Sequence, residues 1–141
     1  MSLRCSSYLV TGSTDGIGEH TATRLAQQGA TVLIHGRSAA KVEAAVQRLR
    51  QQYSASGAVI HGYTADLSSL ASVRQLASKV REQHPVLTTL INNAGVFEPA
   101  RKQSADGYEM TWAVNVLAPF LLTSLLLPTV SDRVVNTASI S

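Results

Sequence analysis

A glycine-rich turn near the start of the chain has the residue types that bind a phosphate group. The stretch from Tyr8 to Gly18 reads Tyr-Leu-Val-Thr-Gly-Ser-Thr-Asp-Gly-Ile-Gly, a short apolar run followed by glycines at positions 12, 16 and 18. Glycine lets the backbone bend sharply and lets a bulky anion approach without a Cβ in the way. A helix that begins near Gly16 would aim unpaired N–H groups and the positive end of its dipole at the same place. The pattern therefore predicts a pyrophosphate site.

The setting of this turn carries more weight than the glycines themselves. Their spacing is Gly-x-x-x-Gly-x-Gly, whereas the commoner dinucleotide fingerprint is Gly-x-Gly-x-x-Gly. Ordinary loops also collect glycine, so the spacing alone is weak support for a nucleotide site. Here an apolar strand precedes the turn, a helix follows it, and a second strand completes a βαβ unit, which favours the phosphate-binding interpretation.

The residues after the second apolar run indicate which nucleotide the turn would bind. Thr31–His35 is apolar and is predicted to be a strand, and the corner that follows reads Gly36-Arg37-Ser38. Sites for NAD place a carboxylate here to accept hydrogen bonds from the ribose 2′-hydroxyl, whereas an arginine accommodates the 2′-phosphate of NADP. The corner holds one guanidinium and no carboxylate, which favours NADP. The alternative is that Arg37 is a solvated side chain at a helix entrance.

Polar and small residues follow two further predicted strands. Asp66 and Leu67 come after a strand predicted over 58–64, and Asn92-Asn93-Ala94-Gly95 comes after one predicted over 87–91. Small and amide residues let the chain pass close to a ligand at the carboxyl edge of a parallel sheet, where such folds bind their ligands. For Asp66 the alternative is a role in starting the next helix.

Three amphipathic patterns separate these apolar runs and predict helices. The first ends at Gly29, a residue type suited to a left-handed helix cap, while Ser38 is predicted to cap the second helix and Pro85 to end the third. Their apolar faces are Ile17, Thr21, Ala22, Leu25 and Ala26; Val42, Ala45, Val46, Leu49 and Tyr53; and Val73, Leu76, Ala77 and Val80. The alternation of strands and helices predicts an α/β fold, a doubly wound parallel sheet of the Rossmann type.

The longest helical pattern runs from about Ser104 to Leu127, and the part from Val114 to Leu127 is apolar over most of its circumference. We expect this helix to be buried nearly all round, as a core helix or as the interface of a homo-oligomer, with a bend at Pro119. The apolar part, 113–127, is shorter than a membrane span, so no transmembrane segment is expected. The amide of Asn115 lies within this apolar pattern and must find hydrogen-bond partners.

Composition limits the classes of function. The chain has 141 residues, of which 45% are hydrophobic, with a mean hydropathy of +0.08, which is typical of a single soluble domain. The net charge is +3, but the cationic residues are scattered, which does not favour nucleic-acid binding. The lone Cys5 and the lack of an apolar signal segment lead us to expect a reducing, cytoplasmic location. The four histidines lack metal-ligand spacing, so no metal is expected.

Several of these segments, in their order along nearly the whole chain, resemble the short-chain dehydrogenase/reductase family. They are Thr11-Gly12-Ser13-Thr14-Asp15-Gly16-Ile17-Gly18, Asp66-Leu67, Asn92-Asn93-Ala94-Gly95, Asn115 and Ser139, which follows a fifth strand predicted over 133–137. The stretches 66–70 and 115–123 are most similar to the retinol-dehydrogenase-like branch. The resemblance implies an NADP-dependent oxidoreductase that interconverts a small-molecule alcohol and carbonyl, with a hydrophobic substrate as one alternative.

The resemblance also implies a role for each segment. The glycine turn would hold the cofactor phosphates, Arg37 would select NADP, and the other two segments would contact the adenine and the adenosine ribose. Asn115 would organise a proton-relay water, and Ser139 would hydrogen-bond the substrate carbonyl. The implied cofactor-binding residues are Gly12, Ser13, Thr14, Asp15, Gly16, Ile17, Gly18, Arg37, Asp66, Leu67, Asn93, Ala94 and Gly95, and the implied catalytic residues are Asn115 and Ser139.

One family motif is missing from this sequence. The family's acid/base tyrosine belongs to a Tyr-x-x-x-Lys motif that follows the catalytic serine, and none of the four tyrosines here has a lysine four positions later. General acid–base catalysis typically contributes about 10²–10⁴ in rate, so we expect this chain to be inactive alone. We expect an NADP-binding domain over 1–141 that is incomplete at its C-terminus, truncated after the fifth strand. That strand would be an exposed edge and the long apolar helix would lack cover, which predicts poor solubility or a need for a partner.

Two other functions stay open at this point. The chain could be a non-catalytic NADP(H)-binding fragment or regulatory isoform. It could also be an unrelated Rossmann protein such as a methyltransferase, although Arg37 and the segment Asn92–Gly95 argue against that class.

Overall fold

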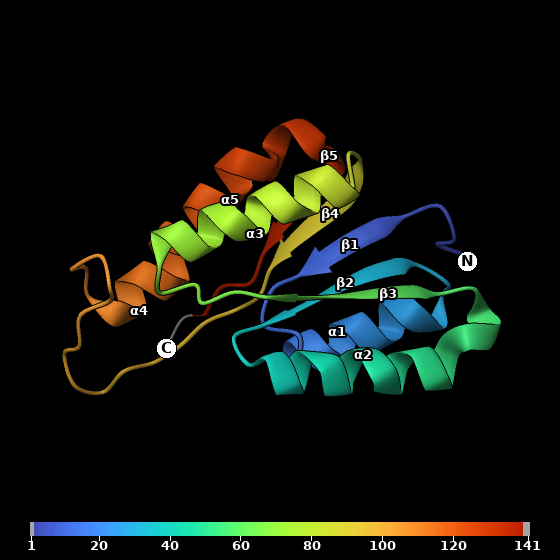
Figure 1. The fold of residues 1–141 in the computed structure, drawn as a ribbon, viewed down its shortest axis with the longest axis horizontal. Helices are drawn as coiled ribbons and strands as arrows, with labels where there is room; N and C mark the ends of the chain where they lie inside the picture. Colours follow the sequence, from blue (N-terminus) through green and yellow to red (C-terminus); the bar gives the residue numbers. More distant parts are fainter. Residues whose placement is uncertain (1, 140–141) are drawn as a thin grey trace.

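The computed structural model describes residues 2–139 and shows an α/β fold built on a five-stranded parallel sheet (Figure 1). In Figure 1, helices α1 and α2 cover one face of the sheet, and helices α3 and α5 cover the other. This is the doubly wound arrangement that the alternation of strands and helices predicted.

The elements follow the predicted order. The strands are β1 (Ser7–Val10), β2 (Thr31–Gly36), β3 (Val59–Thr64), β4 (Leu87–Asn92) and β5 (Val130–Asn136). The helices are α1 (Gly16–Gln27), α2 (Ala39–Tyr53), α3 (Leu70–Gln83), the short α4 (Met110–Trp112) and α5 (Ala118–Leu126). Short helical turns join some of them: η1 (Ser54–Ser56), the π-helical η2 (Ala113–Leu117) and η3 (Leu127–Thr129).

Local chemistry explains several of these boundaries. The side chain of Ser38 accepts a hydrogen bond from the backbone N–H of Lys41 at 3.3 Å, so it caps α2 as predicted. Ser69 caps α3 in the same way through the N–H of Ser72. Gly29 follows α1 with a φ of +85°, the left-handed conformation that glycine adopts most easily.

The strand order β3-β2-β1-β4-β5 places β1 at the centre of the sheet. The chain winds outward from β1 in both directions, so its carboxyl end is the switch point where folds of this kind bind ligands. The register brings the strand exits level, because Val10 pairs with Ile34 on one side and with Ile91 on the other.

The core has two layers that share the sheet. On one face, Ala22 and Ala26 of α1 pack with α2 and with Val32 and Ile34 of β2. On the other face, α3 and α5 pack against side chains such as Leu33, whose neighbours in β2 point the opposite way. The alternation along β2 therefore serves both layers.

The long apolar stretch differs from its prediction. Its helical part begins at Met110 and not at Ser104, because Glu109 caps it by accepting hydrogen bonds from the N–H groups of Thr111 and Trp112. The departure from regular α-helix is the π-helical segment η2, which ends before the predicted bend at Pro119. The expectation of burial all round is wrong, since Phe120 is 73% exposed.

The expectation of no transmembrane segment used the apolar part 113–127, which is shorter than the helical stretch in the structure. Within residues 2–139, one helical stretch, Met110–Thr129, is long and apolar enough to cross a membrane, with 20 residues and a mean hydropathy of 1.7. Of its apolar window, 28% is buried in the fold. The buried part includes Leu122 and Leu126, which belong to the same core cluster as α3. Core helices of soluble proteins can have this length and composition, but they are mostly buried, whereas less than a third of this window is.

Strand β5 forms one edge of the sheet, as predicted from the sequence. It pairs with β4, from Leu87 against Val130 to Asn92 against Asn136. Most of its residues are exposed, which is unlike the buried strands β1 and β2.

Candidate functional site

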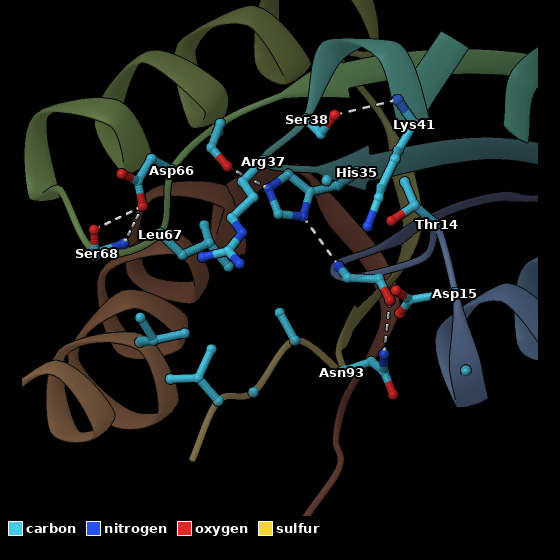
Figure 2. A pocket seen from close by; sticks show the side chains of 18 of the residues that line it. Thr14, Asp15, His35, Arg37, Ser38, Lys41, Asp66, Leu67, Ser68 and Asn93 are labelled. Carbon is cyan, nitrogen blue, oxygen red and sulfur yellow. Dashed lines mark hydrogen bonds between the residues drawn. The ribbon is translucent and has the colours of Figure 1, made fainter. Parts of the chain in front are cut away.

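A cavity of about 610 Å³ opens at the carboxyl ends of the strands, next to the switch point. This volume is within the range of small-molecule and cofactor sites. Figure 2 shows the cavity between the glycine turn, the corner after β2 and the exits of β3 and β4. The predicted cofactor-binding residues that line it are Gly12, Thr14, Asp15, Gly16, Ile17, Arg37, Asp66, Leu67, Asn93, Ala94 and Gly95.

Two predicted residues of the turn, Ser13 and Gly18, lie beneath the cavity and do not line it. Both are buried. The hydroxyl of Ser13 accepts the N–H of His35 at 3.0 Å, which ties the turn to β2. A Cβ on Gly18 would lie 2.2 Å from the carbonyl oxygen of Gly12, so the start of α1 packs directly on the turn. These two residues therefore fix the conformation of the turn through contacts on its buried side.

The glycines of the turn differ in what surrounds them. Gly12 and Gly16 both have left-handed φ values, +62° and +58°. A Cβ on Gly12 would meet the Cα of Ala94 at 2.9 Å, whereas no atom lies within 4 Å of a Cβ on Gly16. Gly12 is thus required by the close approach of the segment after β4, and Gly16 faces open space at the N-terminus of α1. Helix N-termini of this kind bind phosphate groups through their N–H groups.

The exits of β1 and β4 are joined by Thr11 and Asn93. The hydroxyl of Thr11 accepts the N–H groups of Asn93 and Ala94, both at 3.0 Å. In return, the side-chain amide of Asn93 donates to the carbonyls of Thr11 and Gly12 at 3.1 and 3.2 Å. This network fixes the segment after β4 against the glycine turn. Thr11 belongs to the family segment named above but received no role from the sequence, because its role depends on a partner segment that lies 82 residues further along.

The corner after β2 has a cationic rim. Arg37 is exposed and lines the cavity, together with Ser38 and Lys41. The corner is close to the glycine turn, since a Cβ on Gly36 would lie 2.7 Å from the side chain of Thr14. Lys41 was not predicted. Its position three residues after the Ser38 cap, on the first turn of α2, could have indicated it.

Asp66 lies at the exit of β3, where its carboxylate accepts the hydroxyl and the N–H of Ser68 at 2.7 and 2.9 Å. The side-chain hydrogen bond from Ser68 is the main cause that lowers the pKa of Asp66, and the positive charge of Arg37 contributes. The carboxylate is therefore ionised at neutral pH. The helix-start alternative is also partly correct, because the turn made by Asp66 and Ser68 leads into α3.

The two predicted catalytic residues are not among those that line the cavity. Asn115 is exposed, on the π-helical segment η2, and its amide accepts the N–H and donates to the carbonyl of Val96, both at 2.8 Å. It therefore finds partners, as predicted, although not in an apolar surround. Ser139 lies three residues past the end of β5 and is exposed, while Thr137 of the same segment does line the cavity.

The architecture and the site agree with one sequence family. Residues 7–141 match the family model described as short chain dehydrogenase. The chain belongs to this family. The resemblance drawn from the motifs is thus confirmed, as is the Rossmann-type fold.

The curated relatives of this chain include two retinol dehydrogenases. Human retinol dehydrogenase 13 is 36% identical over 139 residues, which cover 96% of this chain and 41% of that protein. Mouse retinol dehydrogenase 14 is 42% identical over 129 residues, which cover 86% of this chain and 39% of that protein. The chain spans about two fifths of the length of these curated relatives.

Solved structures show the same fold with a nicotinamide cofactor. The RhlG/NADP active-site complex of Pseudomonas aeruginosa is 34% identical with a TM-score of 0.83, and the match covers 98% of this chain and 56% of that one. A blue fluorescent protein from a metagenomic library, in complex with NADPH, is 30% identical with a TM-score of 0.83, covering 99% and 58%. The roles of individual residues in this chain stay predictions.

Proposed function

We propose that this chain is the NADP-binding part of an oxidoreductase that interconverts an alcohol and a carbonyl. NADP would supply the hydride acceptor, and NADPH the hydride donor. The observation that carries the proposal is the cationic rim beside the glycine turn. Arg37 and Lys41 line the cavity there, and no carboxylate occurs in the corner Gly36-Arg37-Ser38.

The donor set fits a dinucleotide with a 2′-phosphate. The N-terminus of α1, with open space at Gly16, would bind the pyrophosphate through backbone N–H groups. The guanidinium of Arg37 and the ammonium of Lys41 would bind the 2′-phosphate, since charge-assisted hydrogen bonds to phosphate are the strongest polar contacts. Both cations lie on the same rim as Ser38, whose side chain holds the first turn of α2 in place.

The remaining predicted residues would bind the other parts of the cofactor. Asp66 and Leu67 would contact the adenine, and Asn93, Ala94 and Gly95 would pack beside the adenosine ribose. Support for this comes from the cavity, which all of them line. The ionised Asp66 carboxylate suits acceptance of a hydrogen bond from an amino group.

The catalytic roles extend the proposal beyond the cavity. We propose that Ser139 hydrogen-bonds the substrate carbonyl and that Asn115 supports a proton relay through the backbone of its helix. The π-helical turn at Asn115 supports this role, because such turns leave a backbone carbonyl outside the regular helical pattern and occur often at functional sites. The sequence has no Tyr-x-x-x-Lys, so the proposed activity of these 141 residues alone is binding without measurable turnover.

A second candidate is a non-catalytic NADP(H)-binding protein, in which the glycine turn and the rim of Arg37 and Lys41 would bind the nucleotide without turnover. Both functions need the same rim, so one experiment tests the binding they share. Isothermal titration calorimetry would compare NADP⁺ and NAD⁺ binding to the wild type, to Arg37→Asp and to Arg74→Asp, an exposed residue of α3 that serves as the charge-matched control.

We expect Arg37→Asp to weaken NADP⁺ binding by at least tenfold, because a hydrogen bond to a charged group is worth about 1.5–3 kcal/mol. NAD⁺ binding should change little or improve, and Arg74→Asp should leave both affinities unchanged. Equal losses for the two nucleotides in Arg37→Asp would remove Arg37 from the phosphate site. To separate the two functions, the chain extended by a segment that bears Tyr-x-x-x-Lys would be assayed for NADP-linked turnover.

A further inference from the structure

His35 lies where the glycine turn, β2 and the exit of β3 meet. It is the last residue but one of β2, and only 2% of its surface is exposed. Its backbone pairs with Ser13 of the turn, whose N–H donates to the carbonyl of His35 at 2.9 Å. From the sequence, this histidine showed only that it lacks metal-ligand spacing.

The imidazole ring joins two segments that are far apart in the sequence. Nδ1 accepts the N–H of Gly12 at 3.0 Å, and Nε2 lies 3.0 Å from the carbonyl oxygen of Ala65 (Figure 2). Because the N–H of Gly12 is a donor, Nδ1 must carry no proton. Because the carbonyl of Ala65 is an acceptor, Nε2 must carry one. The site therefore selects a single form, the neutral Nε2–H imidazole.

Protonation of the ring would oppose this arrangement. A second proton, on Nδ1, would face the N–H of Gly12. Burial lowers the pKa of His35, although its hydrogen bond to Ala65 raises it. The charged side chains that line the same cavity as the ring include Asp15 in the turn, Arg37 after β2, Lys41 on α2 and Asp66 after Ala65.

We propose that His35 is a positioning residue that holds the glycine turn and the exit of β3 at the separation NADP binding requires. The inference rests on the proposed function. Its physical basis is that Gly12, with a φ of +62°, leads into the N–H groups that would hold the pyrophosphate, while Ala65 leads into Asp66, which would contact the adenine. One ring thus sets the relative position of two proposed contact regions.

Two substitutions each remove one of the two hydrogen bonds that the His35 ring makes. His35→Asn keeps an acceptor for the N–H of Gly12 but is too short to reach Ala65. His35→Gln reaches Ala65 with an amide donor but offers no acceptor at the place of Nδ1. Neither side chain titrates. His20→Asn, at an exposed position on α1 away from the cavity lining, is the control for loss of a histidine.

The experiment is calorimetric titration of NADP⁺ at pH 7.5, with far-UV circular dichroism to verify folding. We expect both His35 variants to bind about fivefold or more weakly at pH 7.5, since each loses one buried hydrogen bond. His20→Asn should bind NADP⁺ as tightly as the wild type. Equal affinities in all four proteins would overturn the proposal.

A second measurement tests the His35 link independently of whether the protein binds NADP⁺. If the wild type binds no NADP⁺ at pH 7.5, the proposed function is wrong, and the His35 link is decided by NMR of the wild type. Long-range ¹H–¹⁵N spectra should then show the Nε2–H form at pH 7.5, with the Gly12 amide shifting when the ring titrates. The same spectra decide the question if the His35 variants do not fold. A ring that carries its proton on Nδ1, or that is charged at pH 7.5, would overturn the link.

Discussion

The two helical layers of this protein differ in the polarity of the surface they turn toward solvent. On one face of the sheet, α1 and α2 bury small and branched side chains against it and present polar residues outward. Within these two helices, whose residues are all described, Ile17 is the only exposed large hydrophobic residue, and it lines the cavity. On the other face, the stretch from α4 to η3 exposes Trp112, Val116, Phe120 and Leu127.

The difference separates a layer with a polar outer surface from one with an apolar outer surface. The α1–α2 layer carries the glycine turn and the cationic rim. The outer side of the α4–α5 stretch is apolar, as is typical of surfaces that contact another protein segment or a second copy. The homo-oligomer through Val114–Leu127 stays a prediction, and this exposed face is the part of the helix that would form it.

The largest expected effect contrasts the two sides of α5 itself. Leu122 is 1% exposed in the core, whereas Phe120 is 73% exposed. Leu122→Ala should lower the free energy of unfolding by about 3 kcal/mol, because it leaves a cavity. Phe120→Ala should change it by less than about 0.5 kcal/mol in a monomer. Urea unfolding measures both, and size-exclusion chromatography reports self-association. A loss at Phe120 as large as that at Leu122 would show that its side chain is covered in solution.

A smaller effect on the free energy of unfolding is expected for substitutions in the glycine turn, which lies in the α1–α2 layer. Gly18→Ala should destabilise the protein by about 2 kcal/mol, because its Cβ would lie 2.2 Å from the Gly12 carbonyl and 2.5 Å from the Asn93 amide. Gly16→Ala should cost only about 1 kcal/mol, from its left-handed φ, and should act mainly on NADP⁺ binding. Chemical unfolding with parallel NADP⁺ titration separates the two. The account is contradicted if Gly16→Ala is the more destabilising change.

The smallest expected effect is a pH dependence of the free energy of unfolding that comes from His35, His61 and His84. Burial lowers the pKa values of His35, His61 and His84, with Arg50 adding to the effect on His61 and His61 to that on His84. Below about pH 6.5 the unfolded chain therefore binds protons that the folded chain does not, so stability falls as the pH drops. For the buried His35 the slope is at most about 1.4 kcal/mol per pH unit. Unfolding free energies that stay constant from pH 7.5 to 5.5 would contradict this.

Much of the fold could be predicted because the signals were local. Alternating apolar runs and helical stripes located the strands and helices, and the Ser38 cap and Gly29 each act within a few residues. The glycine turn was also predictable, since its strand, turn and helix are consecutive in the sequence. The matching strand exits then followed from the rule that parallel strands share a carboxyl edge.

The missed features depend on long-range partners. His35 looked like a lone histidine in an apolar run, because its ring partners lie 23 and 30 residues away in the sequence. The exposure of Phe120 could not be read from its apolar neighbours, since hydropathy does not tell a core face from a contact face. Asn115 was expected in an apolar surround, but the π-helical turn places it at the surface against Val96.

We propose that the rim of Arg37 and Lys41 makes this an NADP site, and a titration of the unmodified protein measures that preference. Calorimetry at pH 7.5 would compare the affinities for NADP⁺ and NAD⁺, which differ only in the 2′-phosphate. The account predicts binding of NADP⁺ at least tenfold tighter than of NAD⁺, because each charge-assisted contact to the phosphate adds about 1.5–3 kcal/mol. Equal affinities, or tighter binding of NAD⁺, would contradict it.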